Sequence, residues 1–149
     1  MSEVVLTVDV VVAGAGPAGS AAALTLARGG RDVLLLDKAR FPREKCCGDG
    51  LTTAALRHLE DLGLDPHAVA SWQVVEDVCV RSPSGRTVEL ALPRGRGLYA
   101  AVARRSDLDA ALVGLARGHG VRVHDGHRLV GARQEDGAIS VDVEGLGPV

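Results

Sequence analysis

The sequence predicts an α/β fold built on a Rossmann-like strand–helix–strand unit with a parallel sheet. Residues 8–13 are apolar except for one aspartate, which is typical of a buried parallel strand. A Gly-x-Gly-x-x-Gly turn at 14–19 follows this run directly. The Ala- and Leu-rich stretch 18–28 is then predicted to be a helix ended by two glycines, and 32–36 a second apolar strand.

Each residue of the glycine turn has a physical purpose in such a unit. Gly14 permits the tight turn, Gly16 lets the backbone approach a pyrophosphate, and Gly19 allows the helix to pack closely on the strand. Pro17 suits the first helical turn, which Ala18 continues. The helix N-terminus then offers N–H groups and a positive dipole end to phosphates.

Asp37 completes the pattern at the end of the second predicted strand. It lies 18 residues after Gly19, close to the roughly 20 expected for a carboxylate that accepts ribose hydroxyls. The acid favours an unphosphorylated ribose, so NADP is not expected at this unit. The alternative is a plain glycine turn in an ordinary α/β core, because Gly and Ala are abundant here. The ordered series of strand, turn, helix, strand and acid favours a dinucleotide site.

Composition limits the other function classes. Hydrophobic residues make up 46% of the 149 residues, enough for the core of one domain or of a piece of a larger one. Aromatic residues are only 2%, which argues against stacking surfaces for single-stranded nucleic acid. The net charge is −2 and the basic residues are scattered, so no nucleic-acid partner is expected.

The cysteines and the N-terminus indicate the compartment. Cys46, Cys47 and Cys79 are odd in number and form neither a disulfide framework nor a zinc-ligand spacing, so no metal site is predicted. The N-terminus has no basic flank or cleavage site, and no apolar run approaches the roughly 18 residues of a membrane span. We expect a cytoplasmic protein without a transmembrane segment, and leave peripheral membrane association open.

The middle of the chain alternates irregular segments with short elements. Residues 41–50 are expected to be irregular, followed by a helix from 51 or 52 to 62 and one further helical turn at 66–70. Residues 74–92 are predicted to form a β-hairpin around Ser-Pro-Ser-Gly, with alternating apolar residues as in a one-sided antiparallel sheet. A strand at 98–103 follows a basic turn.

A second helix and a second hairpin end the chain. Ser106 is predicted as the helix N-cap, with Asp109 as the acid three residues later. Gly118 and Gly120 end this helix, and 121–124 is placed to rejoin the parallel sheet. Residues 127–144 are predicted as a hairpin about an Asp-Gly turn.

Three further stretches support a family resemblance when taken with the glycine turn. They are Arg-Phe-Pro-Arg-Glu-Lys-Cys-Cys-Gly-Asp-Gly-Leu-Thr at 40–52, Arg-Ser-Pro-Ser-Gly-Arg at 81–86, and Ala-Arg-Arg-Ser-Asp-Leu-Asp-x-x-Leu at 103–112. Together they resemble the N-terminal part of the geranylgeranyl reductase family, within the flavoproteins folded like para-hydroxybenzoate hydroxylase. The first of the three is the most discriminating.

The resemblance implies an FAD-dependent oxidoreductase that reduces isoprenoid carbon–carbon double bonds of a hydrophobic substrate, with hydride from NAD(P)H or a reductase partner. Residues 1–72 and 103–149 would belong to the FAD-binding domain and its crossover β-sheet, and 73–102 would begin an incomplete substrate-domain sheet. One alternative is an FAD-dependent monooxygenase or halogenase, although in such halogenases the loop reads Gly-Glu-Ser instead of Cys-Gly-Asp. Another is a catalytically incomplete FAD-binding fragment.

The resemblance also implies which residues contact FAD, whereas it assigns no catalytic residue. Arg43 would sit in the loop that crosses the pyrophosphate, Cys47 would approach the ribityl chain or flavin ring, and backbone groups near Val130 would contact adenine. The alternative for Arg105 is a surface ion pair with Asp107 or Asp109. The alternative for Lys38 is a solvated side chain. The predicted FAD contacts are Gly14, Gly16, Pro17, Ala18, Gly19, Asp37, Lys38, Arg43, Cys47, Gly48, Asp49, Arg105 and Val130.

Family members continue with a later strand and a Gly-Asp segment that complete the FAD site. We expect the present chain to stop after two of the three strands of the crossover sheet, leaving an open edge and an uncovered apolar face. A truncated product, a fragment and half of a split protein completed by a partner chain all fit this expectation. Alone, the chain is expected to bind FAD weakly or not at all, without turnover.

Overall fold

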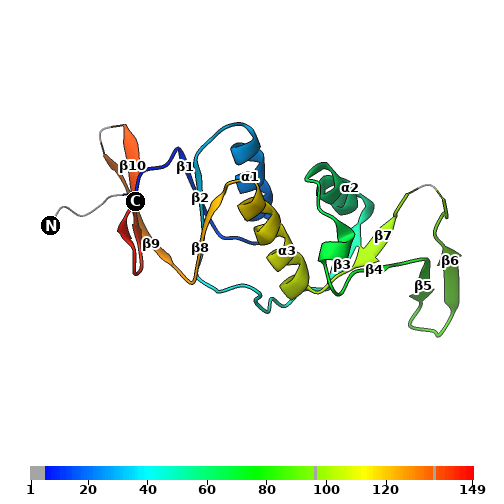
Figure 1. Ribbon diagram of the computed structural model, residues 1–149. Coiled ribbons are helices and arrows are strands. Elements are labelled where there is room, and N and C mark those ends of the chain that lie inside the picture. Colours follow the sequence, from blue (N-terminus) through cyan, green and yellow to red (C-terminus); the bar gives the residue numbers. More distant parts are fainter. Residues whose placement is uncertain (1–5, 96, 136) are drawn as a thin grey trace.

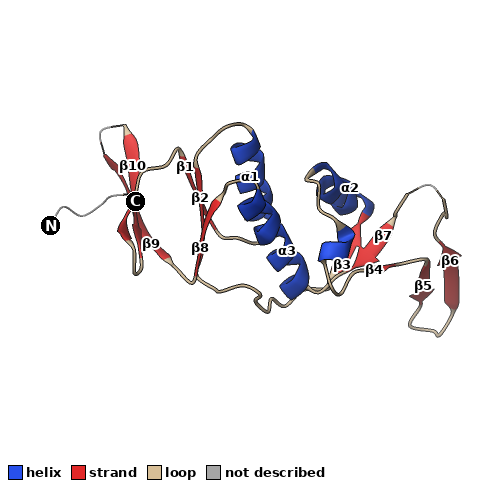
Figure 2. Ribbon diagram, in the orientation of Figure 1, coloured by secondary structure: helices blue, strands red, loops and turns tan. Residues whose placement is uncertain are grey.

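A three-stranded parallel sheet forms the centre of the computed structural model, which describes residues 6–95, 97–135 and 137–149 (Figure 1). Its strands β1 (Val10–Ala13), β2 (Val33–Asp37) and β8 (Arg122–Asp125) lie in the order β1-β2-β8. Helices α1 (Pro17–Arg28) and α3 (Arg105–Gly118) lie side by side against this sheet (Figure 2). The predicted Rossmann-like α/β fold class is confirmed.

The central strand β2 is buried on both faces, which explains its unbroken apolar sequence. Because side chains alternate along a strand, Leu35 points to the helix side, where it packs near Val113 of α3. Leu34 and Leu36 point to the opposite face, where they pack against Val141.

That opposite face is covered by the crossover sheet, whose strands lie in the order β11-β10-β9. They are β9 (Leu129–Glu135), β10 (Ala138–Val143) and β11 (Gly147–Pro148). The expectation of only two strands was wrong, because the chain turns after β10 and β11 pairs with it at Asp142 and Val143. The expectation of an uncovered apolar face was also wrong for Val141 and Val143, which are 5% and 3% exposed against the parallel sheet.

A second group of elements lies beyond α3 and contains a three-stranded antiparallel sheet in the order β3-β7-β4. The group consists of β3 (Gly50–Thr52), α2 (Thr53–Asp61), the 3₁₀ turn η1 (Pro66–Ala68), β4 (Gln73–Val74) and β7 (Ala100–Val102). Residues 50–52, expected to be irregular or helical, form a strand because β7 supplies their backbone partners. In this sheet β3, from the expected FAD-binding portion 1–72, pairs with β7 of the expected substrate-domain portion 73–102. The division of the chain into these two portions stays a prediction.

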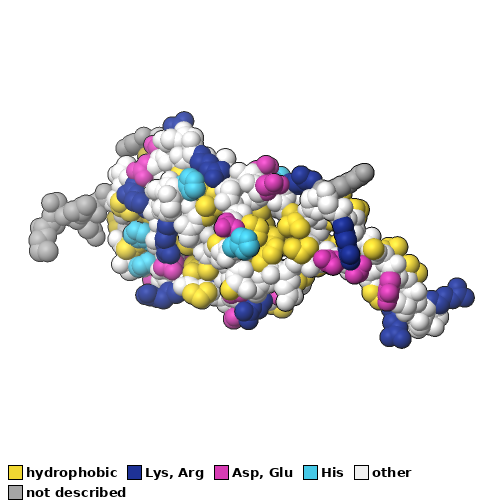
Figure 3. Space-filling model, turned by 45° about the vertical axis from the view of Figure 1, so that its right-hand side comes forward, with side chains coloured by type: hydrophobic (Ala, Val, Ile, Leu, Met, Phe, Trp, Pro, Cys, Tyr) yellow, Lys and Arg dark blue, Asp and Glu magenta, His cyan; other side chains and the backbone are white. Residues whose placement is uncertain are grey.

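The predicted hairpin is formed by β5 (Asp77–Arg81) and β6 (Thr87–Ala91), but the strand expected from 74 is broken before β5. Val78 lies opposite Leu90 and Val80 opposite Val88, so apolar residues share one face. These four side chains are 37–56% exposed, and Figure 3 shows hydrophobic atoms along the projecting hairpin.

The start of α3 differs from the expected capping box. The helix begins at Arg105, after Arg104 as N-cap, so Ser106 already lies inside the first turn. The Ser106 hydroxyl donates to Asp107 Oδ1 (3.2 Å) instead of capping a backbone amide. Asp109 does not reach back to a cap either, because its carboxylate is fully buried and bonded to Arg105.

The loop after β2 is fastened to the end of β8. The Phe41 amide donates to Asp125 Oδ2 (3.1 Å), and the Gly126 amide donates to the Ala39 carbonyl (3.0 Å). The Phe41–Pro42 peptide bond is cis. These contacts fix the path of the loop just before Arg43. Within the described ranges, no helix combines the length and apolar character needed to cross a membrane.

We predict that Asp125→Asn destabilises the fold by about 1 kcal/mol at pH 7, because a charge-assisted hydrogen bond becomes a neutral one. The Phe41 amide and the nearby Arg117 guanidinium lower the pKa of Asp125. A carboxyl with a lowered folded-state pKa stabilises the protein above its unfolded value of about 3.9 and loses that effect as pH falls. Urea unfolding at pH 7 and pH 3 should therefore show a larger difference from wild type at pH 7 than at pH 3. Glu60→Gln, at an exposed position of α2, is the control. An equal loss at both pH values would contradict the role of the charge.

Candidate dinucleotide-binding site

The glycine turn is shaped by a close approach between its two ends. A Cβ atom on Gly19 would lie only 1.7 Å from the Gly14 carbonyl oxygen. Gly14 has φ +103°, which a residue with a side chain rarely adopts, and its amide donates to the Leu36 carbonyl (2.7 Å). The turn therefore joins α1 to the edge of the parallel sheet without room for side chains.

The first turn of α1 faces this site with its backbone amides. Gly16 is the N-cap residue, and no described side chain caps the helix there. Pro17 occupies the first helical position, where it forgoes no intrahelical hydrogen bond. The helix start thus combines amides without a side-chain cap with the positive end of the helix dipole.

Asp37 lies against the glycine turn, as the sequence predicts. Its Oδ2 accepts a hydrogen bond from the Ala15 amide (2.8 Å), and its Oδ1 accepts one from the Ala39 amide (2.8 Å). The side chain is 9% exposed. Each carboxylate oxygen has a second lone pair. Its role toward a ribose stays a prediction.

Two arginines from distant parts of the chain converge on Gly16. Arg43 comes from the loop after β2, and Arg105 is the first residue of α3. One terminal nitrogen of each lies 3.4 Å and 3.6 Å, respectively, from the position that a Cβ on Gly16 would take. The two side chains are only 15% and 18% exposed. Both guanidinium groups are thus held beside the start of α1.

A buried carboxylate, Asp109, lies between these arginines. Arg105 donates to it through Nε (2.8 Å to Oδ1) and Nη2 (2.9 Å to Oδ2). Nη2 of Arg43 is 3.3 Å from Asp109 Oδ2 and 3.9 Å from Asp37 Oδ2. The hydrogen bonds that Arg105 donates to Asp109 raise the pKa of Arg105 above its ordinary value.

Sequence reasoning assigned Asp109 to helix capping or to a surface ion pair with Arg105, and so missed its buried place at the candidate site. The available signal was the spacing of Arg105 and Asp109, four residues apart on a predicted helix. The alternative partner for Arg105, Asp109, is therefore observed, but the pair is buried beside the glycine turn and not at the surface. Asp107 instead pairs with Arg104, at 3.4 Å.

Cys47 and Asp49 extend the site beyond Arg105. The Cys47 thiol is exposed, and its pKa is lowered first by the Asp49 backbone amide and then by a hydrogen bond from Arg105. Asp49 has φ +55°, a left-handed conformation in which aspartate is enriched among non-glycine residues. Gly48 is exposed between them.

Two residues that were predicted to contact FAD, Lys38 and Val130, make no described interaction with the residues around Gly16. Lys38 is exposed directly after Asp37. Val130 lies in β9, where it is the extra residue of an irregularity between the Leu129 and Gly131 pairings, with its side chain 61% exposed. The FAD contacts expected of both residues stay predictions.

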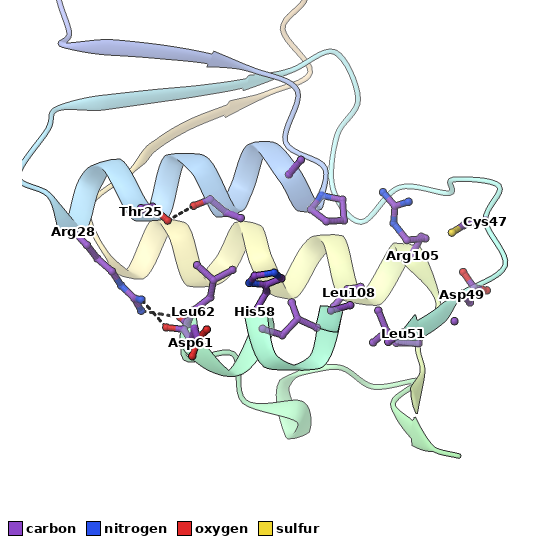
Figure 4. A pocket seen from close by; sticks show the side chains of 17 residues that line it. Thr25, Arg28, Cys47, Asp49, Leu51, His58, Asp61, Leu62, Arg105 and Leu108 are labelled. Atoms are coloured by element: carbon purple, nitrogen blue, oxygen red, sulfur yellow. Dashed lines mark hydrogen bonds between the residues drawn. The ribbon is translucent and has the colours of Figure 1, made fainter. Parts of the chain in front are cut away.

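A largely apolar cavity of about 800 Å³ opens next to the glycine turn, between α1, α2 and α3 (Figure 4). Cys47, Asp49 and Arg105 lie at one end of it. At the other end, Arg28 of α1 donates to the backbone carbonyls of Asp61 (3.2 Å) and Leu62 (2.7 Å). The cavity thus extends from the polar cluster along α1.

These features fit a dinucleotide such as FAD. Arg43 Nε is buried and has no hydrogen-bond partner among the described residues, which leaves this donor available to an acceptor on a ligand. Two guanidinium groups and the α1 amides match the charge and the acceptors of a diphosphate. No group of His, Cys, Asp or Glu side chains in the described ranges could hold a metal ion.

Comparison with known proteins agrees with this geometry. The family model described as "FAD binding domain" matches residues 7–147. The chain belongs to the FAD binding domain family.

Two curated relatives are reductases. The chain is 42% identical over 130 residues to the menaquinone reductase of Mycolicibacterium smegmatis, covering 82% of the chain and 30% of that protein. It is 35% identical over 130 residues to the digeranylgeranylglycerophospholipid reductase of Methanosarcina mazei, covering 86% and 31%. The chain therefore spans about a third of the length of these relatives.

Solved structures share the fold. A geranylgeranyl bacteriochlorophyll reductase-like protein from Thermoplasma acidophilum superposes with a TM-score of 0.76 at 27% identity, covering 91% of the chain and 34% of that protein. The flavin-dependent brominase Bmp2 superposes with a TM-score of 0.77 at 27% identity, covering 95% and 35%. The resemblance to the geranylgeranyl reductase family is thus confirmed.

We predict that Gly19→Ala lowers the free energy of unfolding by about 3 kcal/mol or more, because the new methyl overlaps the Gly14 carbonyl oxygen. Gly114→Ala is the matched control, since nothing lies within 4 Å of a Cβ at this position of α3. It should stabilise the protein by about 0.5–1 kcal/mol through helix propensity. Urea denaturation compares the two variants. Wild-type stability of Gly19→Ala would contradict the close packing.

We predict that alkylation of Cys47 by iodoacetamide persists to lower pH than for an ordinary thiol, because the lowered pKa retains the reactive thiolate. Arg105→Met should move the midpoint of the rate–pH profile to higher pH. A Cys46→Ser/Cys79→Ser background isolates Cys47, and the exposed Arg104→Met is the control. An unchanged midpoint in Arg105→Met would show that Arg105 does not act on the thiol.

Proposed function

We propose that this chain is the FAD-binding N-terminal portion of a flavin-dependent reductase that saturates isoprenoid carbon–carbon double bonds. The observation that carries the proposal is the convergence of Arg43 and Arg105 on Gly16 at the start of α1. Asp37 contacts the same turn through the Ala15 amide. Two guanidinium groups and a carboxylate thus lie at one backbone turn, which supports the proposal.

The proposed role of these residues is binding and orientation. The α1 amides and the two guanidinium groups would hold the diphosphate, and Asp37 would accept the adenosine ribose hydroxyls. The loop at Cys47–Asp49 would direct the rest of the cofactor toward the substrate side. FAD, when bound, would supply the hydride-transfer chemistry. We take NAD(P)H or a reductase partner as the electron donor.

The choice of a reductase rests on the sequence relatives. Their names pair a reductase with menaquinone and with digeranylgeranylglycerophospholipid, both hydrophobic molecules. The brominase supports an FAD-dependent monooxygenase or halogenase as the second candidate through its similar fold. The Cys-Gly-Asp loop favours the reductase, as the family resemblance implies.

The relatives are about three times as long as the part of them that this chain matches. We also propose that turnover needs the counterpart of their unmatched part, either in the same chain or as a complementing chain. The open edge of β1 in the parallel sheet and the exposed apolar face of the β5–β6 hairpin support this proposal. The 149-residue chain itself is expected to bind FAD weakly.

We predict that Gly16→Ala weakens FAD binding about tenfold, equivalent to about 1.4 kcal/mol. The new methyl would lie 3.4 Å and 3.6 Å from the two arginine nitrogens, in the space proposed for phosphate, without overlapping the backbone. Flavin fluorescence and NMR titrations measure the dissociation constant, with Gly114→Ala as the control. FAD binding that Gly16→Ala leaves unchanged would contradict the proposed location of the diphosphate.

The reaction class is tested with a fusion of this chain to the remaining part of the M. smegmatis menaquinone reductase. Under anaerobic conditions with NAD(P)H, a reductase should yield product with one double bond fewer in the isoprenoid chain. A monooxygenase or halogenase should instead consume oxygen in proportion to product. Product that forms only with oxygen would overturn the reductase proposal.

A further inference from the structure

Asp109 is an unusual residue for the interior of a helix, because its carboxylate is fully buried. Burying a carboxylate costs free energy unless it is paired and hydrogen-bonded. Asp109 meets this condition with two arginines that come from separate elements, Arg105 on its own helix and Arg43 on the loop after β2. The carboxylate is therefore the common contact of both guanidinium groups.

The contacts of Asp109 fix the orientation of Arg105. The guanidinium is held through two nitrogens, Nε at 2.8 Å and Nη2 at 2.9 Å, in the two-bond geometry that arginine forms with carboxylates. The helical spacing of four residues allows this pairing without a change in backbone. Nη2 is also the atom that lies 3.6 Å from the Cβ position of Gly16.

Arg43 is held from several sides. Its Nη2 lies 3.3 Å from Asp109 Oδ2 and 3.9 Å from Asp37 Oδ2, and its Cζ lies 5.1 Å from the centre of the Phe41 ring. The shorter of the two carboxylate distances is the one to Asp109. Without Asp109, Arg43 would keep Asp37 at 3.9 Å as its carboxylate contact among the described ion pairs, and Arg105 would lose its two-bond partner.

We propose that Asp109 is a positioning residue that holds Arg43 and Arg105 in place to receive the diphosphate of the cofactor. The proposal rests on the proposed FAD-binding function and deepens it. Asp109 is fully buried between the arginines and acts through them, so it would not itself touch the ligand. Its effect should therefore depend on the phosphates and not on the nucleoside.

ADP and adenosine separate these two contributions. In NMR titrations of the 149-residue chain, Asp109→Asn should raise the dissociation constant of ADP about tenfold, comparable to the loss of one positioned charge-assisted contact. The dissociation constant of adenosine should stay unchanged. Asp107→Asn is the matched control, because Asp107 lies two residues away on the same helix and pairs with Arg104. It should leave both constants unchanged.

Three outcomes would overturn the proposal. A parallel loss of ADP and adenosine binding would indicate a general structural role for Asp109. Unchanged ADP binding would show that the arginines do not need it. Tighter ADP binding would show that its negative charge opposes the phosphates. If wild type binds neither ligand, the proposed function fails for this chain and the inference fails with it, whereas the first three outcomes leave the function standing.

A second measurement on the wild-type protein covers the case in which Asp109→Asn does not fold. The Arg105 Nε–H should give a resolved NMR signal that exchanges slowly with water, because it donates to a buried carboxylate. Adding ADP should shift this signal, while that of the exposed Arg104 should not move. An Arg105 signal that stays unshifted while the amides of the glycine turn respond would contradict the positioning role.

Discussion

The structure depends on the close approach of α1 to the turn that precedes it. The backbone at Gly19 leaves no space for a side chain beside the Gly14 carbonyl. This contact brings the start of the helix to the edge of the parallel sheet, where Asp37 ends β2 and bonds to the Ala15 amide. Every other part of the candidate site is arranged around that backbone turn.

Two segments then bring positive charge to the turn. The loop after β2 is tied to β8 through the Phe41 amide and Asp125, and this connection places Arg43. The first residue of α3 supplies Arg105. Because both guanidinium groups share Asp109, two cations coexist in a nearly buried site, which a diphosphate could enter as a further acceptor. These ion pairs thus link β2, the loop after it and α3.

The family resemblance and the local elements were predictable because they rest on short-range patterns. The glycine spacing, the buried strands and Asp37 follow from residues close together in sequence, and the Phe-Pro-Arg to Gly-Asp-Gly stretch identified the family. The errors involve partners that are distant in the sequence. Residues 50–52 form β3 only because β7 pairs with them, and residues 147–148 form β11 because β10 offers an edge. Ser106 lost its capping role because α3 begins two residues earlier than expected.

By itself the sequence determined the strand–turn–helix–strand unit, since hydrophobic periodicity and glycine conformations act over a few residues. It also determined which residue types were available to bind a dinucleotide. Only the tertiary structure decided that Arg43 and Arg105 meet over Gly16 and that Asp109 is buried between them. The physical reason is that a buried charge must be neutralised by whatever groups the packed fold brings within reach, and no local pattern specifies those partners.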